Sequence, residues 1–425
     1  MITFTQLKPN VFHLHYPAEK GEITTLYQVT LSAGGSLSEK KEQYGISHLV
    51  EHTIASYYNG MDATALGKYY TENAMYQNAS TSHSYLKVIS QGHISDSEKL
   101  LDMALSKSLS AELREETFEQ QKKIVLSEIA KYYGDPERIL QSYENKKRFN
   151  KNSYVHNEIG GTKETVSALT FQDIQERYSD MLSRSEVLLV SAGGKLSQED
   201  IAQRLLDKIK KFDSQKDIVP LFFDEKAGLK KFKILPVVHE HGHEDVLLKF
   251  YLPFPSRFED YGVSLLYREI FFSGRSSFMY DTLRNKLGII YSLSSNVWVD
   301  DNLIIVSLTL KKDFLQQAID AFIDIICNTV VAKIHEHFEI VKKAIVKRED
   351  LSNDKLFSGL NFTEYMLVAY NKFVLPHEWL MILEKVSEKD ILEYHDEVRK
   401  NLDQLQLSLT TKDSEVEKMN LIVPA

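Results

Sequence analysis

The stretch of this sequence best suited to catalysis is His48-Leu-Val-Glu51-His52. If it is helical, the two histidines lie one turn apart on the same face, so both imidazoles can bind one metal ion. Glu51 lies beside that face, where its carboxylate can accept a proton from water at the metal. The alternative is an exposed helix that carries two histidines and a glutamate without a metal. We favour a metal site because this spacing of residue types rarely arises by chance.

A catalytic zinc needs a third protein ligand and one open position. The best candidate is Glu128, and apolar residues at helical spacing put it on or beside the apolar face of its helix: Ile124, Val125, Ile129 and Tyr132. A carboxylate in that position needs a cation, a hydrogen-bond donor or a metal to offset its desolvation. The alternative is a glutamate at the edge of the apolar stripe that reaches solvent or Lys131. Beside the histidine pair, the metal role is the stronger interpretation.

Strands and helices alternate in mixed order around these residues. The patterns predict strands over 11–16 and 24–32, a strand pair over 75–91, and a buried strand from 186 that ends at Gly193-Gly194. They predict helices over 45–58, 95–111 and 115–133. The first of these helices carries the histidine pair and the last carries Glu128. The periodicity lapses between 211 and 230. We therefore predict a zinc-binding catalytic domain over 1–212, a linker over 213–230 and a second domain over 231–425.

The two halves contain an internal repeat. The stretch that begins at Tyr44-Gly and contains the histidine pair aligns with the stretch that begins at Tyr261-Gly. Both stretches follow two strand-like segments, and both open a helix. In the second copy, the positions of His48, Glu51 and His52 are occupied by Leu265, Arg268 and Glu269. We infer a duplicated domain of which only the first copy keeps residues that could bind a metal.

The composition narrows the class of protein further. The chain has 425 residues, 43% of them hydrophobic, and carries 51 Lys and Arg against 60 Asp and Glu, a net charge of −9. This balance excludes a disordered chain and a general nucleic-acid binder, and it favours basic peptides as partners. The single cysteine, Cys327, has no partner within the chain. With no signal-like N-terminus and no long apolar run, we expect a cytoplasmic protein without a membrane span.

The histidine pair and Glu128 together resemble a known family. Their spacing is similar to that of the inverzincins, the pitrilysin/insulinase-type zinc metallopeptidases, which include the mitochondrial processing peptidases and short two-domain bacterial members. The resemblance covers essentially the whole chain, because these proteins consist of duplicated halves in which only the first keeps the zinc site. It implies that His48, His52 and Glu128 bind Zn²⁺ and that Glu51 is the general base.

Asn78, Ala79, Ser80 and Thr81 extend this resemblance. They are similar to the edge strand that pairs with the substrate backbone in the family, which implies a substrate-binding role for all four residues. The alternative is a polar turn that precedes a strand.

In the second half, the segment 283–292 resembles the Arg/Tyr segment of the family. The resemblance implies that Arg284 and Tyr291 are catalytic and reach the substrate carbonyl and the oxyanion. A guanidinium and a phenol are suitable donors for a developing oxyanion. The alternatives are a surface helix charge for Arg284 and a core aromatic for Tyr291.

Gln121 departs from the family pattern. Many relatives carry a supporting Glu at this position, seven residues before the ligand glutamate. A glutamine can still orient a metal ligand by hydrogen bonding, but it removes a negative charge near the metal. We therefore expect Gln121 to support the site with weaker zinc affinity.

Together these features predict an α+β fold with two homologous domains, each a mainly antiparallel sheet packed with helices as in the processing peptidases. The expected function is zinc-dependent endopeptidase action on peptides or unfolded segments, with zinc-activated water and Glu51 as general base. Because two domains supply only half of a peptidase chamber, we expect a homodimer, or a heterodimer with a zinc-less homologue. The alternatives are a non-catalytic assembly subunit, or a narrow processing peptidase that trims leader peptides with a sister subunit.

Overall fold

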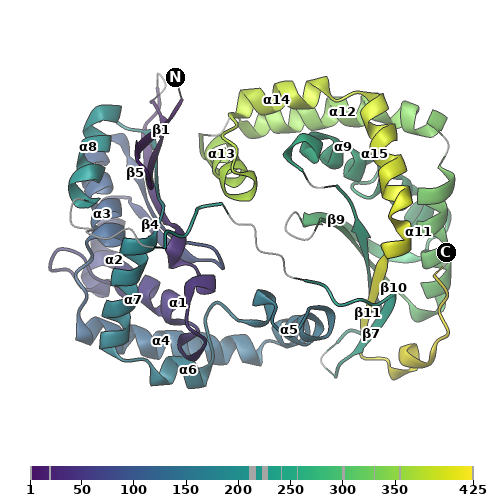
Figure 1. Ribbon diagram of the computed structural model, residues 1–425, viewed down its shortest axis with the longest axis horizontal. Coiled ribbons are helices and arrows are strands. Elements are labelled where there is room, and N and C mark those ends of the chain that lie inside the picture. Colours follow the sequence, from purple (N-terminus) through teal and green to yellow (C-terminus); the bar gives the residue numbers. More distant parts are fainter. Residues whose placement is uncertain are drawn as a thin grey trace. The chain divides into compact units, whose positions relative to one another are not determined.

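The computed structural model describes residues 2–18, 21–209, 217–222, 228–240, 242–255, 257–298, 302–329, 331–353 and 356–423. The chain forms two compact units (Figure 1), each taken from two stretches of sequence. Unit 1 comprises Met1–Gly134 and Asn157–Phe223, and unit 2 comprises Asp135–His156 and Asp224–Ala425. Much of the linker predicted over 213–230 lies outside the described residues.

Unit 1 is built on a six-stranded sheet with the order β1-β2-β6-β3-β5-β4. Its strands are β1 (Thr3–Lys8), β2 (Val11–Tyr16), β3 (Thr24–Leu31), β4 (Tyr76–Thr81), β5 (Leu86–His93) and β6 (Val187–Gly193). Only β2 and β6 pair in parallel, and every other neighbouring pair is antiparallel. The prediction of a mainly antiparallel sheet is confirmed for this unit.

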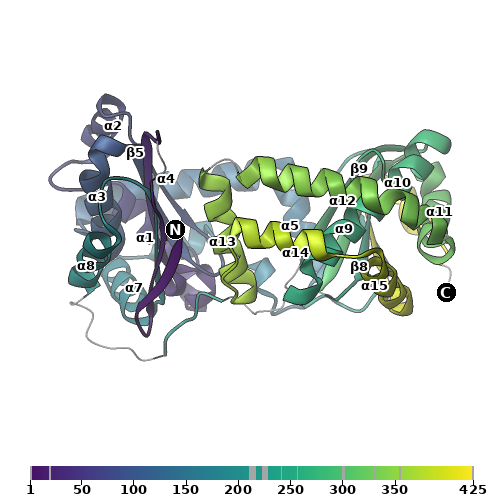
Figure 2. The same ribbon diagram turned by 90° about the horizontal axis from the view of Figure 1, so that it is seen from above.

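The helices of unit 1 are α1 (Ile46–Ala55), α2 (Ala63–Glu72), α3 (Ser97–Leu109), α4 (Glu115–Gly134), α6 (Lys163–Ala168), α7 (Phe171–Arg184) and α8 (Gln198–Ile209). Both ribbon views show α3 and α8 along the same face of the sheet (Figure 2). They bury apolar side chains there against strand residues such as Tyr27, Val29 and Leu189. A second cluster of buried side chains joins α1, α4 and α7, so the helix with the histidine pair is packed on a fixed scaffold.

Unit 2 repeats the same topology. Its five-stranded sheet has the order β7-β11-β8-β10-β9, formed by β7 (Ile234–Val238), β8 (Val246–Pro253), β9 (Ile290–Trp298), β10 (Leu303–Leu310) and β11 (Gln406–Thr411). The one parallel pair is β7 with β11, which corresponds to β2 with β6 in unit 1. The order also matches β2-β6-β3-β5-β4 strand for strand. This correspondence supports the duplication inferred from the sequence, and the α+β fold class is confirmed.

The helices of unit 2 are α5 (Pro136–Arg148), α9 (Tyr261–Phe271), α10 (Phe278–Tyr280), α11 (Leu315–Asn328), α12 (Val331–Asn353), α13 (Leu356–Tyr370), α14 (Pro376–Lys385) and α15 (Glu388–Lys400). The counterpart of α1 is α9, which follows β8 as α1 follows β3, and β8 is the strand that matches β3 in the sheet order. Among the described residues, no single helix is long and apolar enough to cross a membrane. The stretches 312–328 and 333–350 pass that test only when taken together, and they are bent by 94°.

Residues 135–156 fall within the range predicted for the first domain, but in the structure they belong to unit 2. An ionic cluster around Glu144 on α5 joins this segment to unit 2: the Glu144 carboxylate lies 3.3 Å from Arg148 and 2.9 Å from Lys249 on β8. Ser408 on β11 also donates to it, at 3.2 Å. Lys249 and Ser408 point away from the apolar core of unit 2, so α5 covers the other face of that sheet.

Candidate metal centre

His48, Glu51 and His52 all lie on α1, as the sequence predicted. The two imidazole rings are neighbours one turn apart, with centroids separated by 4.6 Å and planes at 83°. The helix is preceded by Gly45 in the left-handed conformation, with φ of 93°, where a side chain would be strained. Helical spacing therefore does bring both rings to one face of α1.

Glu128 on α4 lies against this pair. Its Oε2 atom is 3.5 Å from Nε2 of His52 and 3.9 Å from Nε2 of His48. One ligand atom from each of the three residues lies within 4.8 Å of the others. Two imidazole nitrogens and one carboxylate oxygen are a donor set that catalytic zinc sites use. The structure thus brings together the three residues predicted as ligands, while their metal-binding role stays a prediction.

Glu128 is more exposed than its sequence pattern suggested. Its side chain is 49% accessible, and Ile124, one turn earlier, is also exposed. The argument that burial forces this carboxylate to seek a cation is therefore wrong. What supports Glu128 as a ligand is its position against both histidines and not its desolvation.

A hydrogen bond to His52 shows which of its two ring nitrogens is available to a metal. Nδ1 of His52 donates to Oε1 of Gln121 at 3.3 Å, which leaves the lone pair of Nε2 toward Glu128. Gln121 is buried on α4, so it can orient the ring as expected. Burial, with a contribution from the charge of His52, lowers the pKa of His48 to about 4. A neutral imidazole is the form that binds zinc, so these residues fit the ion.

Glu51 is buried beside the histidines and has one defined partner. The hydroxyl of Thr81 donates to its Oε2 at 2.8 Å. Burial raises the pKa of Glu51, and Glu128 adds to this, whereas the Thr81 hydrogen bond and His52 oppose the shift. A carboxylate with a raised pKa is a better proton acceptor near neutral pH. The contact with Thr81 was not foreseen from the sequence, which assigned Thr81 to substrate binding alone.

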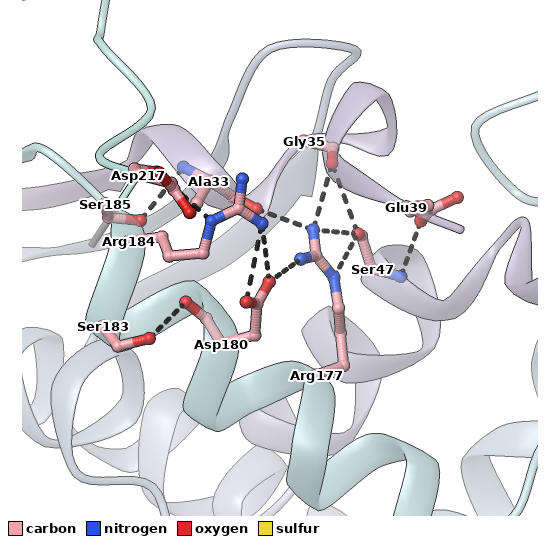
Figure 3. A network of polar contacts seen from close by, with 10 residues as sticks. All are labelled: Ala33, Gly35, Glu39, Ser47, Arg177, Asp180, Ser183, Arg184, Ser185 and Asp217. Carbon is pink, nitrogen blue, oxygen red and sulfur yellow. Dashed lines mark hydrogen bonds and ion pairs between the residues drawn. The ribbon is translucent and has the colours of Figure 1, made fainter. Parts of the chain in front are cut away.

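The first turn of α1 is held by a polar network (Figure 3) that the sequence did not reveal. Glu39 accepts hydrogen bonds from the backbone N–H groups of Gly45 and Ser47, at 3.0 and 2.8 Å, and so caps the helix. The buried guanidinium of Arg177 on α7 points at the same turn and donates to the hydroxyl of Ser47 at 3.0 Å. Ser47 precedes His48, so this network fixes the start of the metal-binding helix.

Arg177 also ties that helix to the chain before it. It donates to the carbonyl oxygens of Ala33 and Gly35, at 2.6 and 3.2 Å, and pairs with Asp180 at 2.9 Å. On the other side of the helix start, a side chain at Gly45 would meet the carbonyl oxygen of Gly160 at 2.6 Å. Only glycine permits this close approach. A helical arginine and a glycine in a loop carry no sequence pattern that points to these contacts.

The predicted substrate-binding residues form most of β4, an edge strand. Asn78 pairs with Ile89 of β5 on one side, and among the described strands none pairs with the other side of β4. Asn78 and Ser80 are exposed, whereas Ala79 and Thr81 are partly buried and alternate with them. The alternative of a polar turn is wrong. The strand leaves backbone groups available for another chain, but its substrate role remains a prediction.

Arg284 and Tyr291 belong to unit 2, whereas the histidines and Glu128 belong to unit 1. Arg284 lies in a π-helical turn, Asp281–Lys286, and donates to the carbonyl oxygen of Ile290. Tyr291 lies on β9 where the pairing with β10 shifts, and 55% of its surface is exposed, so it is not a core aromatic. Both conformations recur at functional sites, because they re-aim side chains.

Two family models match adjoining parts of the chain. The model described as Insulinase (Peptidase family M16) matches residues 27–163, which contain the histidine pair, Glu51 and Glu128. The model described as Peptidase M16 inactive domain matches residues 168–344, which contain Arg284. The chain has a duplicated α+β fold, and its three candidate metal ligands all lie in the first half. The chain belongs to the pitrilysin/insulinase-type peptidase family M16.

Known relatives agree with this assignment. A protein of Rickettsia felis named as an uncharacterized zinc protease is 22% identical over 374 residues, which cover 84% of this chain and 86% of the relative. A protease from Helicobacter pylori has a similar structure, with a TM-score of 0.74, 16% identity and coverage of 97% and 99%. The M16 inactive domain from Pseudomonas fluorescens has a TM-score of 0.75, 13% identity and coverage of 96% and 97%. At these identities the two structures establish the fold alone.

Proposed function

We propose that the chain is a zinc-dependent endopeptidase that hydrolyses peptides or unfolded segments. The observation that carries this proposal is the convergence of His48, His52 and Glu128 on one point beside the buried carboxylate of Glu51. Membership of peptidase family M16 and the printed name of the Rickettsia felis relative support it.

The chemistry follows from what each group can do. Zinc, when bound, supplies a Lewis acid for the scissile carbonyl and lowers the pKa of a water molecule. His48, His52 and Glu128 would hold the ion, and Gln121 orients the ring of His52 through Nδ1. Glu51 accepts the proton of the attacking water at its carboxylate and passes it to the leaving amine.

The substrate would pair with the outer edge of β4. An extended peptide satisfies the unpaired N–H and C=O groups of an edge strand and extends the sheet by one strand. Thr81 joins this strand to Glu51 through its hydroxyl, so a peptide bound on β4 lies beside the general base. Such pairing uses the backbone of the substrate, which suits unfolded segments better than folded proteins.

We propose that a homodimer completes the site, with Arg284 and Tyr291 of one copy donating to the oxyanion in the other. Complementation between inactive subunits tests this assembly. A Glu51→Gln subunit retains Arg284 and Tyr291, and an Arg284→Ala subunit retains the general base. Mixing the two after subunit exchange should restore activity that neither preparation has alone. No gain on mixing would contradict shared sites, and the zinc-less heterodimer would then be the assembly to test.

Digestion of a peptide library by the wild type and by Glu51→Gln tests the function itself, with the zinc content of both proteins measured in parallel. We expect the wild type to cleave peptides and the variant to be slower by about 10²- to 10⁴-fold at equal zinc content. Equal activity of the two proteins would refute the assigned mechanism. Two equally inactive proteins without zinc would favour a non-catalytic assembly subunit.

A further inference from the structure

A small pocket adjoins the general base in unit 1. It has a volume of about 180 Å³ and lies between α1, α2, α3 and the strands β4 and β5. Glu51 and His52 form part of its wall, and Ala79 of the edge strand forms another part. A peptide that pairs with β4 and is cleaved beside Glu51 would therefore place a side chain next to the scissile bond at this pocket.

Lys107 on α3 lines the same pocket and is almost completely buried, with 2% of its surface exposed. Its ammonium group donates to the carbonyl oxygen of Ala55, the last residue of α1, at 2.6 Å, and to the hydroxyl of Tyr70 at 2.7 Å. An ammonium has three N–H donors, so one remains. No carboxylate among the described residues forms an ion pair with it. Burial lowers the pKa of Lys107 to about 8, so the cation persists at neutral pH.

Gln77 on β4 adds a second donor that lacks an acceptor. Its Oε1 accepts from the hydroxyl of Ser90 at 3.0 Å, which directs Nε2 elsewhere. Nε2 is buried and has no hydrogen-bond partner, and Gln77 also lines the pocket. Buried polar groups are nearly always paired, so an orphaned donor that lines the same pocket as a buried cation indicates a missing acceptor.

We propose that this pocket is a subsite for an acidic substrate side chain next to the scissile bond, recognised by Lys107 and Gln77. A carboxylate supplies both the negative charge and the acceptor oxygens that the two donors lack. Glu51 does not fill that role, because the hydrogen bonds of Lys107 go to Ala55 and Tyr70 and the one to Glu51 comes from Thr81. The net charge of −9 attracts basic peptides at long range. The pocket instead recognises a single acidic side chain by direct contact, so both preferences can hold for one peptide.

The inference rests on the proposed peptidase function and is tested with matched peptides. After the library has identified a cleaved bond, peptides that carry Glu or Ala on either side of it are compared by kcat/KM. We expect the wild type to prefer Glu over Ala by about tenfold or more at one of the two positions. Lys107→Met should reduce this ratio toward unity. Lys99→Met, which removes the same charge from an exposed site on the same helix, should leave the ratio unchanged.

A second variant separates recognition from a structural effect, since Lys107 also bonds to the end of α1. Gln77→Leu leaves Lys107 and α1 intact and should also lower the Glu/Ala ratio. If the wild type cleaves peptides without preferring an acid at either position, the subsite is refuted and the peptidase stands. If it cleaves none, the proposed function fails, and fluorescence anisotropy with a labelled Glu-containing peptide from the library and its Glu→Ala counterpart decides the subsite. Equal affinity for the Glu and Ala peptides would then overturn it.

Discussion

Thr81 on the edge strand β4 donates its hydroxyl to Oε2 of Glu51 on α1, at 2.8 Å. This single hydrogen bond links the strand available for substrate pairing to the residue proposed as general base. It fixes one carboxylate oxygen of Glu51. In the proposed mechanism, substrate alignment and base orientation therefore depend on the same side chain.

Replacing Thr81 by Val should lower kcat by about tenfold, because Val keeps the branched shape but cannot donate to Glu51. Zinc affinity should not change, since Thr81 is not one of the three candidate ligands and its hydroxyl donates to Glu51. Thr81→Ser, which keeps the hydroxyl, is the matched control and should retain most of the rate. Steady-state kinetics with a fluorogenic peptide measures both variants. A wild-type kcat for Thr81→Val would show that the contact does not orient the base.

Removing the amide of Gln121 should weaken zinc binding by about 10- to 100-fold, because Nδ1 of His52 would lose the partner that orients the ring. Gln121→Leu tests this, with competition against a chromophoric chelator as the readout. The neighbouring Gln120 is exposed, so Gln120→Leu is the control that makes the same substitution at an exposed position. Equal zinc affinity for both variants would argue against the orienting role.

Arg177→Met should lower the free energy of unfolding by about 3 kcal/mol, because it removes the buried guanidinium that donates to Ser47 and to the carbonyl oxygens of Ala33 and Gly35. It should also weaken zinc binding, since Arg177 holds Ser47 beside His48. Arg184→Met on the same helix removes another ion pair with Asp180 and no contact with α1, so its cost should stay below about 1 kcal/mol. Denaturant unfolding and zinc competition measure both effects. Equal losses in the two variants would contradict a special role for Arg177.

Acid should destabilise unit 2 through Glu144. Burial alone would raise the pKa of Glu144, but the charges of Arg148 and Lys249 together hold it below its ordinary value. A lowered folded-state pKa means that the stabilisation is complete above the unfolded-state pKa and is lost as pH falls through the folded-state value.

At pH 7, Glu144→Gln should therefore cost about 3 kcal/mol or more, and the difference from wild type should shrink below about pH 4. Calorimetric unfolding across this pH range measures the difference. Glu137→Gln, an exposed change on the same helix, gives the baseline. A difference that stays constant down to pH 3 would contradict the ionic role of Glu144.

The sequence predicted what depends on local spacing. The histidine pair is readable because i and i+4 positions share a helix face, and the fold class because alternating strand and helix patterns recur in both halves. Glu128 was also predicted, although for a reason that its exposure contradicts. Its match to the family pattern located it better than its burial did.

The remaining features depend on contacts between segments far apart in the chain. Arg177 looks like an ordinary helical charge until folding buries it against Ser47. Residues 135–156 join unit 2 through contacts such as that of Glu144 with Lys249, a partner more than a hundred residues away. Lys107 likewise becomes a buried cation without a carboxylate partner among the described residues only when α1, α2 and α3 enclose it. No periodicity or composition encodes such pairings.

Zinc stoichiometry tests the central claim most directly, because the account depends on His48, His52 and Glu128 forming one metal site. The measurement is the zinc bound per chain after loading and desalting, determined by mass spectrometry for the wild type, His52→Leu and Glu128→Gln. We predict about one zinc per wild-type chain and a large loss in both variants, while the exposed Glu119→Gln on the same helix behaves as wild type. A wild type that ignores added zinc, or variants that retain it fully, would contradict the account.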